Sequence, residues 1–479
     1  MTSCEKNNDP DNGGGTGGNE NPQQIIFNGN EIGDGRQEFE LTGDHTIKKG
    51  TYVLKGWVYV TNGATLTIEP GTVIKGDIQT KAAIIVERGG KINAQGTATE
   101  PIVFTSNQIA GSRKPGDWGG MILCGKAVNN KTEMMIEGGP RSKHGGNDNN
   151  DNSGILSYVR IEFAGYPFNT DMEINGLTMG SVGKSTQLDH IQVSYSNDDS
   201  YEWFGGCVNA GYLIAYHGWD DDFDTDNGYS GNLQFLLSVR NPRIADASVS
   251  NGFESDNEAN GTAITPVTSP VFSNVTVIGP RGQVADFENT TSYINGGAYN
   301  PGNGSKLGQF QSAMQIRRSS QLNCYNSLFV GFPVGVIIEN DKGSQTQEAA
   351  TAGKLALKNL VFSQMGILGS DQNKSFKDLY TNKSSIAEGE TGESFSAGFF
   401  KTAAFGNIAN ATSSDIALDA GFAPEPGSIL LGKSNLFTDT KVSDTFFTKV
   451  NYIGAFQSSS ASDNWTAGWA NFDPQNTKY

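Results

Sequence analysis

Short apolar runs alternate with polar residues along the chain from about residue 46 onward. The first runs, separated by Gly, Asn or Pro, are TYVLKGWVYV, ATLTIEPGTVI, AAIIVERGGKI and PIVFTSN. β-Branched residues recur at alternate positions within each run, which is typical of short strands. The spacing of Ile68, Ile85 and Phe104 indicates a repeat of about 20 residues without a helical period. Such a repeat predicts a solenoid, in which each coil buries its apolar face by stacking on its neighbours.

The fold class predicted from this pattern is all-β, a right-handed single-stranded parallel β-helix with a mixed, aromatic-rich C-terminal cap. The hand follows from the general hand of parallel crossovers. At about 23 residues per coil, residues 46–365 would form roughly 14 coils and a rod about 65 Å long. Residues 1–45 are predicted to be a tether and lead-in. Residues 366–479 are predicted to be an irregular cap, with a short helix near 374–381 and a terminal segment covering the open end.

Two polar stretches interrupt the strand pattern and are predicted to be loops that project from the coils. They are SKHGGNDNNDNSG and NGGAYNPGNGSKLGQ.

Acidic and aromatic residues align between successive coils. The aligned segments are SYEWFGG (200–206), DFDTDNG (222–228), GFESDNE (252–258) and, less closely, DFENTTS (286–292). This alignment places Tyr201, Phe223, Phe253 and Phe287 in one column. Because neighbouring residues of a strand face opposite sides, we expect the aromatic column to point inward and the carboxylates outward. The first outward column is Glu202, Asp224, Glu254 and Glu288, and the second is Phe204, Asp226 and Asp256.

Stacked carboxylates predict a cation site. Two unit charges about 4.8 Å apart repel by about 3.5 kcal/mol at an effective dielectric constant of about 20. Ca²⁺ would compensate, because it accepts six to eight oxygen ligands in loose geometry. The candidate metal ligands are Asp220, Asp221, Asp222, Asp224, Asp226, Glu202, Glu254 and Asp256, and Asp198 and Asp199 can complete the site. Two alternatives remain open: a solvated ladder of turn residues, and a pair of carboxylates that share a proton.

Three residues near these acids are candidates for ligand binding. Phe204 shares the outward column, Trp219 lies at the preceding turn, and Arg240 follows the next strand. An outward aromatic ring beside carboxylates suits a sugar, whose apolar face stacks while its hydroxyl groups form hydrogen bonds. The alternative is that the aromatic residues are buried between coils.

An enzymatic interpretation rests on a partial motif set. Asn169–Asp171 reads NTD, Asp198–Asp199 is a DD pair, and Tyr216–Gly218 reads YHG. These motifs resemble those of the inverting polygalacturonases, and the resemblance would make Asp171, Asp198, Asp199 and His217 catalytic, with paired carboxylates acting as acid and base. The chain departs from that family because the first Gly of GHG is missing and no RxK motif follows. Arg240 and Arg243 form RNPR instead, and Arg317 and Arg318 lie far along the chain.

The charge of the chain limits its possible binding partners, and its cysteine content bears on zinc sites and disulfides. Asp and Glu number 51 against 34 Lys and Arg, for a net charge of −17. This excess argues against nucleic-acid binding and against adsorption to an anionic membrane. The four cysteines form no close pair, so neither a zinc ribbon nor a disulfide framework is predicted.

The N-terminal stretch MTSCEKNNDPDNGGGTGGNENPQQ is polar and rich in Gly, which predicts a tether. Cys4 after small residues resembles the lipobox of a bacterial lipoprotein, which implies a lipid on Cys4 and an earlier signal peptide. The alternative is a cysteine in an unstructured tail. If Cys4 carries a lipid, the protein would contact the membrane through this lipid alone.

Several strings are similar to those of a group of Bacteroidetes outer-membrane lipoproteins of the parallel β-helix type. They are GATLTIEPGTVIKG, YVRIEFAG, NDDSYEWFGG, DDDFDTDNG, GFESDN and DNWTAGWANFDPQNTKY. The resemblance implies exposure at the outer surface and association with components of a TonB-dependent transporter. It supplies no catalytic residues.

These observations lead to three functional hypotheses. The first is a surface lipoprotein that binds an extended extracellular ligand, chiefly glycan, with Ca²⁺ at the acidic face. The second is a β-helix lyase or hydrolase that acts on acidic polysaccharides, and the third is a structural or adhesive surface protein. Whether the protein is an enzyme is left open by the sequence, with the balance of residues favouring a binding protein.

Overall fold

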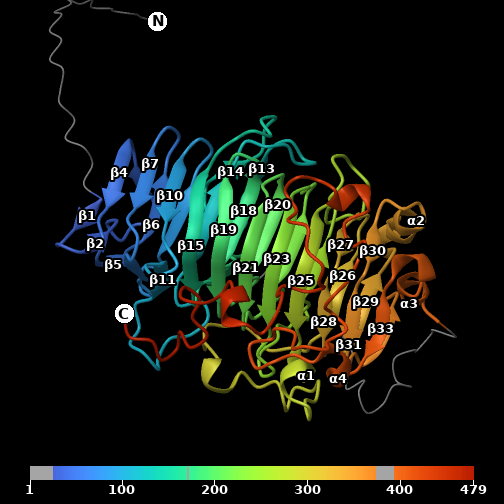
Figure 1. Cartoon of the computed structure of the whole chain (residues 1–479). Coiled ribbons are helices and arrows are strands. Elements are labelled where there is room, and N and C mark those ends of the chain that lie inside the picture. The colour runs from blue at the N-terminus through green and yellow to red at the C-terminus, as the bar shows by residue number, and fades with distance from the viewer. Residues whose placement is uncertain (1–24, 170–171, 374–392) are drawn as a thin grey trace, which may run out of the picture.

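Two long parallel sheets wind together into one elongated rod (Figure 1). The computed structural model describes residues 25–169, 172–373 and 393–479. Each coil adds one strand to an eleven-stranded sheet, called sheet B, and a bent strand or two short strands to an eighteen-stranded sheet, called sheet A. The predicted parallel β-helix is therefore confirmed.

Sheet B follows chain order from one end of the rod to the other. Its strands are β3 (Phe39–Leu41), β6 (Trp57–Val60), β9 (Ala83–Val86), β12 (Gly120–Cys124), β18 (Leu177–Val182), β20 (Tyr201–Gly206), β22 (Phe223–Asp226), β24 (Phe253–Ser255), β26 (Ser312–Ile316), β29 (Val334–Ile338) and β32 (Ile367–Ser370). Within the described residues sheet B thus has fewer rungs than the roughly 14 coils expected. Long insertions lengthen several coils, notably residues 125–153 and 279–311.

Sheet A forms the opposite wall. Its strands are β1 (Ile26–Phe27), β2 (Glu31–Ile32), β4 (Asp44–Ile47), β5 (Thr51–Leu54), β7 (Thr65–Ile68), β8 (Val73–Gly76), β10 (Lys91–Gln95), β11 (Ile102–Ser106), β15 (Gly154–Glu162), β19 (Gln187–Ser194), β21 (Ala210–Tyr216), β23 (Asn232–Val239), β25 (Val271–Ile278), β27 (Asn323–Tyr325), β28 (Leu328–Val330), β30 (Ala356–Lys358), β31 (Val361–Ser363) and β33 (Ile408–Ala411).

Small elements decorate the coils. They are the hairpins β13 (Met134–Met135) with β14 (Lys143–His144) and β16 (Pro167–Asn169) with β17 (Met172–Glu173), and the helices α1 (Pro280–Gln283), α2 (Thr346–Thr351), α3 (Phe395–Phe400) and α4 (Ser413–Ile416). None of the helices in the described residues has the length and apolar character needed to cross a membrane. The helix expected near 374–381 lies outside the described residues.

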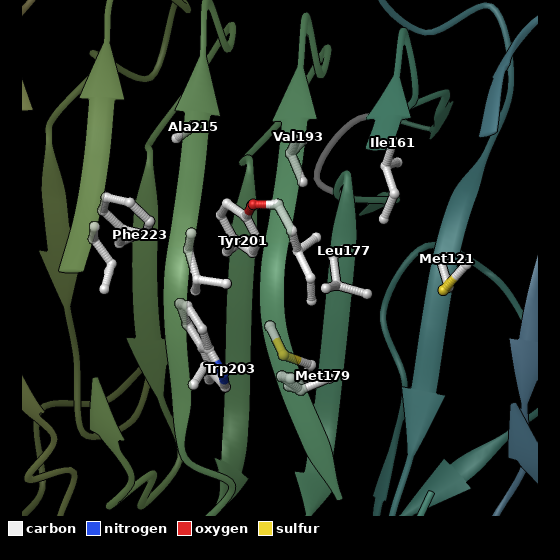
Figure 2. Packing of buried hydrophobic residues seen from close by; sticks show 14 of the residues in the cluster. Met121, Ile161, Leu177, Met179, Val193, Tyr201, Trp203, Ala215 and Phe223 are labelled. Carbon is white, nitrogen blue, oxygen red and sulfur yellow. The ribbon is translucent and has the colours of Figure 1, made fainter. Parts of the chain in front are cut away.

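Aromatic side chains form a continuous column inside the rod. Tyr201 pairs in register with Phe223, and Phe223 with Phe253. Ring centroids lie 5.6 Å apart in the first pair and 5.5 Å apart in the second. Figure 2 shows Tyr201 and Phe223 among the buried residues gathered between the sheets. The predicted register of these three coils is confirmed, because in-register parallel pairing places like residues on like residues.

The prediction that Phe287 is the fourth residue of this column is wrong. Met314, not Phe287, pairs with Phe253 in the next strand. Phe287 lies in the insertion between β25 and β26, where it packs on Phe310 with ring centroids 5.7 Å apart. The insertion contains enough polar turn residues to imitate a coil in the sequence.

The C-terminal region divides into an end cap and a strap. Phe400 of α3 stacks on Phe362 at 4.2 Å between centroids, so α3 packs over the last coils. The terminal strap, residues 436–479, does not cover this end but runs back along sheet A (Figure 1). Its backbone is held by glutamine side chains: Gln234 exchanges two 2.8 Å hydrogen bonds with Thr448, and Gln192 exchanges two 2.7 Å hydrogen bonds with Asn471.

Truncation of the aromatic column tests its role in stability. We expect Phe223→Ala to lower the free energy of unfolding by about 3–5 kcal/mol, because it removes a fully buried ring and leaves a cavity. Urea denaturation followed by tryptophan fluorescence measures the change. Ile109→Ala is the control, because Ile109 is 76% exposed. Equal losses in the two variants would contradict the role of the column.

Candidate functional site

The carboxylates of the aligned coils occupy the outer side of sheet B. Glu202 pairs in register with Asp224, and Asp224 with Glu254. Phe204 pairs with Asp226 in the neighbouring column. The next position after Glu254 is Gln315, and Glu288, which was expected there, is exposed in the insertion. The acidic ladder, as we call Glu202, Asp224, Glu254, Asp226 and Asp256, therefore follows the register of the coils.

Covering segments shield this ladder from water. Glu202 is only 7% exposed and accepts a hydrogen bond from the side-chain amide of Asn175, which lies in the segment before β18. Asn130, in the insertion after β12, donates a 2.7 Å hydrogen bond to the carbonyl oxygen of Asn257. Ser248, in the loop after β23, donates a 2.7 Å hydrogen bond to Asp220. The acidic columns that were expected to point outward thus form a largely covered layer between sheet B and these loops.

Two arginines neutralise the C-terminal end of the ladder. Arg317 Nε lies 2.9 Å from Asp256 Oδ1, and another nitrogen of its guanidinium contacts Glu254. Arg318 Nη1 lies 2.6 Å from Asp256 Oδ2. These arginines are distant in the sequence, but the in-register pairing of β24 with β26 places them one coil after Glu254 and Asp256.

The other end of the ladder has no such arginine among the described residues. Oxygen atoms of Asp199, Glu202 and Asp224 all lie within 4.8 Å of one another. A second group, Asp198, Asp199 and Asp220, meets the same limit and shares Asp199 with the first. In the described part of the chain, none of these five carboxylates forms an ion pair with a basic side chain. Of the expected metal ligands, the structure thus places Glu202 and Asp224 in one group with Asp199, and Asp220 in the other with Asp198 and Asp199.

The remaining acids of that expected set have partners in the protein. Asp222 is fully buried and pairs with Arg240 at 2.9 Å. Asp221 accepts hydrogen bonds from the backbone and side chain of Asn251. The Asp226 carboxylate accepts from the backbone of Asn227.

Burial raises the pKa of the ladder carboxyl groups. For Glu202 and Asp224, loss of hydration is the main cause of the raised pKa, and the neighbouring negative charges add to it. The pKa of Asp199 is raised for the same two reasons. Burial also raises the pKa of Glu254 to about 7, although the positive charge of Arg317 opposes this shift. Burial and mutual repulsion therefore disfavour the charged form of these carboxyl groups, and a nearby cation would favour it.

The three residues expected to contact a ligand are buried, which corrects that expectation. Phe204 is 8% exposed and packs beneath the covering segments with Ile136 and Ile174. Trp219 is fully buried in a cluster with Phe163 and Tyr195.

Arg240 is likewise fully buried. Its guanidinium binds Asp222 and donates a 3.2 Å hydrogen bond to the carbonyl oxygen of Trp219. This arginine therefore joins two coils and does not face solvent.

The positions of the candidate catalytic residues give little support to the enzymatic alternative. Asp171 lies outside the described residues. Asp198 is partly exposed and Asp199 is buried in the turn before β20, and the pKa of each is raised by burial. His217 Nδ1 lies 2.9 Å from the hydroxyl group of Tyr195, and burial lowers the pKa of His217 to about 3. Arg243 donates a 2.9 Å hydrogen bond to the carbonyl oxygen of Tyr293, away from the ladder.

A groove on the flank of sheet A was not anticipated from the sequence. It has a volume of about 370 Å³ and crosses the successive strands β19, β21 and β23. We call it the flank groove; its lining residues are Lys184, Ser185, Thr186, Gln187, Leu188, Asp189, Asn209, Gly211, Tyr212, Gln234, Phe235, Phe446 and Thr448. Phe446 and Thr448 come from the terminal strap, so the groove exists only where the strap lies against the rod.

An aromatic stack crosses sheet A and reaches the flank groove at Tyr212 and Phe235. Tyr158, His190, Tyr212 and Phe235 follow one another on successive coils, with centroid separations of 4.3, 4.4 and 5.1 Å. Each has a positive φ, between 50° and 61°, at the bend of sheet A. Such a backbone is unfavourable for aromatic residues, so stacking compensates for it. The signal in the sequence was an aromatic residue near the middle of each of these strand runs.

The family comparison supports the fold. A family model described as a pectate-lyase-like β-helix domain matches residues 39–400. A solved structure, the crystal structure of Dettilon tailspike protein (gp208), is similar at 11% sequence identity and a TM-score of 0.26. The alignment covers 69% of this chain and 61% of the tailspike chain. The search of curated proteins found no significant match.

The pH dependence of stability tests whether burial raises the pKa of these carboxyl groups, and Glu339 is suited to this test. It continues the acidic face through a 3.0 Å hydrogen bond from Gln315, and burial raises its pKa from 4.5 to about 7. The folded protein then retains a proton that the unfolded chain releases, so this group stabilises the fold below pH 4.5, and its contribution is lost as the pH rises to about 7. Between pH 4.5 and about 7, we expect the melting temperature of Glu339→Gln to fall less steeply than that of the unmodified protein.

Differential scanning calorimetry in buffer with a chelator measures the slope. Asp44→Asn is the control, because Asp44 is exposed on β4. A slope for Glu339→Gln equal to that of the unmodified protein would show that Glu339 does not hold the proton.

Proposed function

The chain belongs to the pectate-lyase-like β-helix family, and from this membership we propose that it binds an extended extracellular polysaccharide at a cell surface. The flank groove is the observation that carries the proposal, since it combines aromatic edges with polar groups across three coils. An elongated polymer aligned with the rod would meet the same kind of surface on each coil.

The lining of the flank groove suits a sugar. Tyr212 and Phe446, which are both partly exposed, present apolar edges against which the C–H groups of a sugar ring can pack. Lys184 and Asn209 supply polar groups at the same wall. The volume of about 370 Å³ falls within the range of about 300–1,000 Å³ common for small-ligand sites.

Binding without cleavage is the function that the site chemistry favours. In the flank groove Asp189 is the acidic residue, and it accepts hydrogen bonds from Ser157 and Gln187 at 2.8 and 2.7 Å. One carboxylate that is already engaged does not supply the acid and base that hydrolysis requires. Cleavage of an acidic polysaccharide by Asp198, Asp199 and His217 is the second candidate, and the description of the family favours it.

We further propose that a lipid on Cys4 holds the protein at the outer surface of a bacterial outer membrane. Cys4 lies outside the described residues, and the proposal is supported by the lipobox-like sequence around it. The polar, Gly-rich tether that follows would keep the rod away from the lipid surface. A neighbouring TonB-dependent transporter would be the partner that receives bound glycan.

Calorimetric titration with neutral and uronic oligosaccharides tests the flank groove. We expect at least one of these sugars to bind, and Lys184→Ala/Asn209→Ala to weaken its affinity about tenfold, a loss of about 1.4 kcal/mol from two hydrogen-bonding groups. Lys91→Ala is the control, because Lys91 is exposed on β10 and outside the groove.

The titration also separates the alternatives. Absence of binding across the panel, or equal weakening by the control, would overturn the proposal. New reducing ends or unsaturated uronate products after incubation would establish the second candidate instead.

Metabolic labelling tests the anchor. When the chain is expressed behind a lipoprotein leader in a Gram-negative host, we expect labelled palmitate to be incorporated. Cys4→Ser should abolish the label, while Cys207→Ser should leave it unchanged. Equal labelling of unmodified protein and the Cys4→Ser variant would rule out lipidation at Cys4.

A further inference from the structure

We propose that Asp199, Glu202 and Asp224 bind a Ca²⁺ ion between sheet B and the segment that covers it. This site is separate from the flank groove and does not depend on polysaccharide binding. The three carboxylates come from the turn before β20, from β20 itself and from β22.

The spacing of the oxygen atoms fits calcium. Ligand atoms of the three residues lie within 4.8 Å of one another. Oxygens bound to one Ca²⁺ at about 2.3–2.6 Å lie at most about 5 Å apart. All three ligands are carboxylates, which favours calcium over zinc.

Asn175 supplies an independent observation. In three successive coils, a side-chain oxygen before the strand accepts a hydrogen bond from the backbone of the following coil. Asp221 N donates to Asp199 at 2.8 Å, Asn251 N donates to Asp221, and Ser312 N donates to Asn251 at 3.0 Å.

Asn175 stands at the equivalent position of the preceding coil, as the pairing of Leu177 with Tyr201 shows. This side chain breaks the pattern. Its amide nitrogen donates to Glu202, while its Oδ1 has no hydrogen-bond partner among the described residues. Asn175 is only 1% exposed, so water does not hydrate this oxygen from the surface.

Asp224, like Asn175, has a side-chain oxygen for which the described residues supply no hydrogen-bond partner. Its Oδ1 is buried and also has no hydrogen-bond partner within the described part of the chain. Buried polar atoms are almost always paired with protein or an ordered ligand. A cation bound by Asp224, Glu202 and Asp199 would satisfy Asp224 Oδ1, and the carbonyl oxygen of the Asn175 side chain is an additional ligand of the kind that calcium accepts.

The distribution of arginine locates the cation at this end of the ladder. Arg317 and Arg318 neutralise Glu254 and Asp256, and Arg240 is committed to Asp222. A divalent ion would balance Asp199, Glu202 and Asp224, which form no ion pair with an arginine of the described residues.

Titration of the metal-free protein with CaCl₂ tests the site. We expect calorimetry to detect binding and native mass spectrometry to show the added mass of calcium. Asp224→Asn should weaken binding at least tenfold. Asp226→Asn is the matched control, because it makes the same change two residues further along β22 and should alter the affinity less than threefold.

Melting temperatures in calcium and in chelator distinguish a ligand from a structural residue. In chelator, Asp224→Asn should melt above the unmodified protein, because it removes one repelling charge. In calcium the order should reverse. A lower melting temperature of the variant in both buffers would show a structural role only.

Three results would overturn the proposal. They are the absence of calcium heat with the unmodified protein, an unchanged melting temperature between calcium and chelator, and equal losses in Asp224→Asn and Asp226→Asn. An equal response to MgCl₂ would overturn the assignment to calcium.

Discussion

In-register stacking of parallel strands is the constraint on which the rest of this structure depends. Each backbone hydrogen bond between coils places a residue directly above its counterpart in the preceding coil. Similar positions in successive coils therefore become neighbours in space. For Tyr201, Phe223 and Phe253 this produces a stabilising column of rings. For Glu202, Asp224 and Glu254 the same register brings together like charges, which repel.

The structure compensates this repulsion differently along the rod. In the turn before the strands, Asp199 and Asp221 accept backbone hydrogen bonds from the next coil, as asparagine does at position 251. At the C-terminal end, guanidinium groups of Arg317 and Arg318 balance Glu254 and Asp256. At the N-terminal end, among the described residues, neither such a backbone hydrogen bond nor an arginine side chain reaches Asp224. The electrostatic problem is therefore confined to a few carboxylates, and this confinement makes a specific ion site physically reasonable.

The sequence predicted what the strand period determines. Solenoid architecture and the alignment of Tyr201, Phe223 and Phe253 followed from alternation and spacing, because these are properties of the strands themselves. The displacement of Phe287 by Met314 was not predictable, since an insertion of polar turn residues resembles another coil. The sequence left the burial of Phe204 and Trp219 as an open alternative for a related reason. A strand pattern identifies the outward side of a coil but does not reveal which loop covers it.

The strap poses the same difficulty over a longer distance. Gln192 and Gln234 appear in the sequence as ordinary polar residues of strands, yet each holds the backbone of a segment more than two hundred residues away. Their amides donate and accept like a backbone peptide, so the strap docks on side chains where a strand would dock on another strand. Because side-chain pairing does not require continuous contact, the strap can leave a gap between its anchors. The flank groove lies beside the anchor at Gln234, with Phe446 and Thr448 of the strap on one side and Tyr212 on the other. The segment that packs along sheet A thereby also forms one wall of the flank groove.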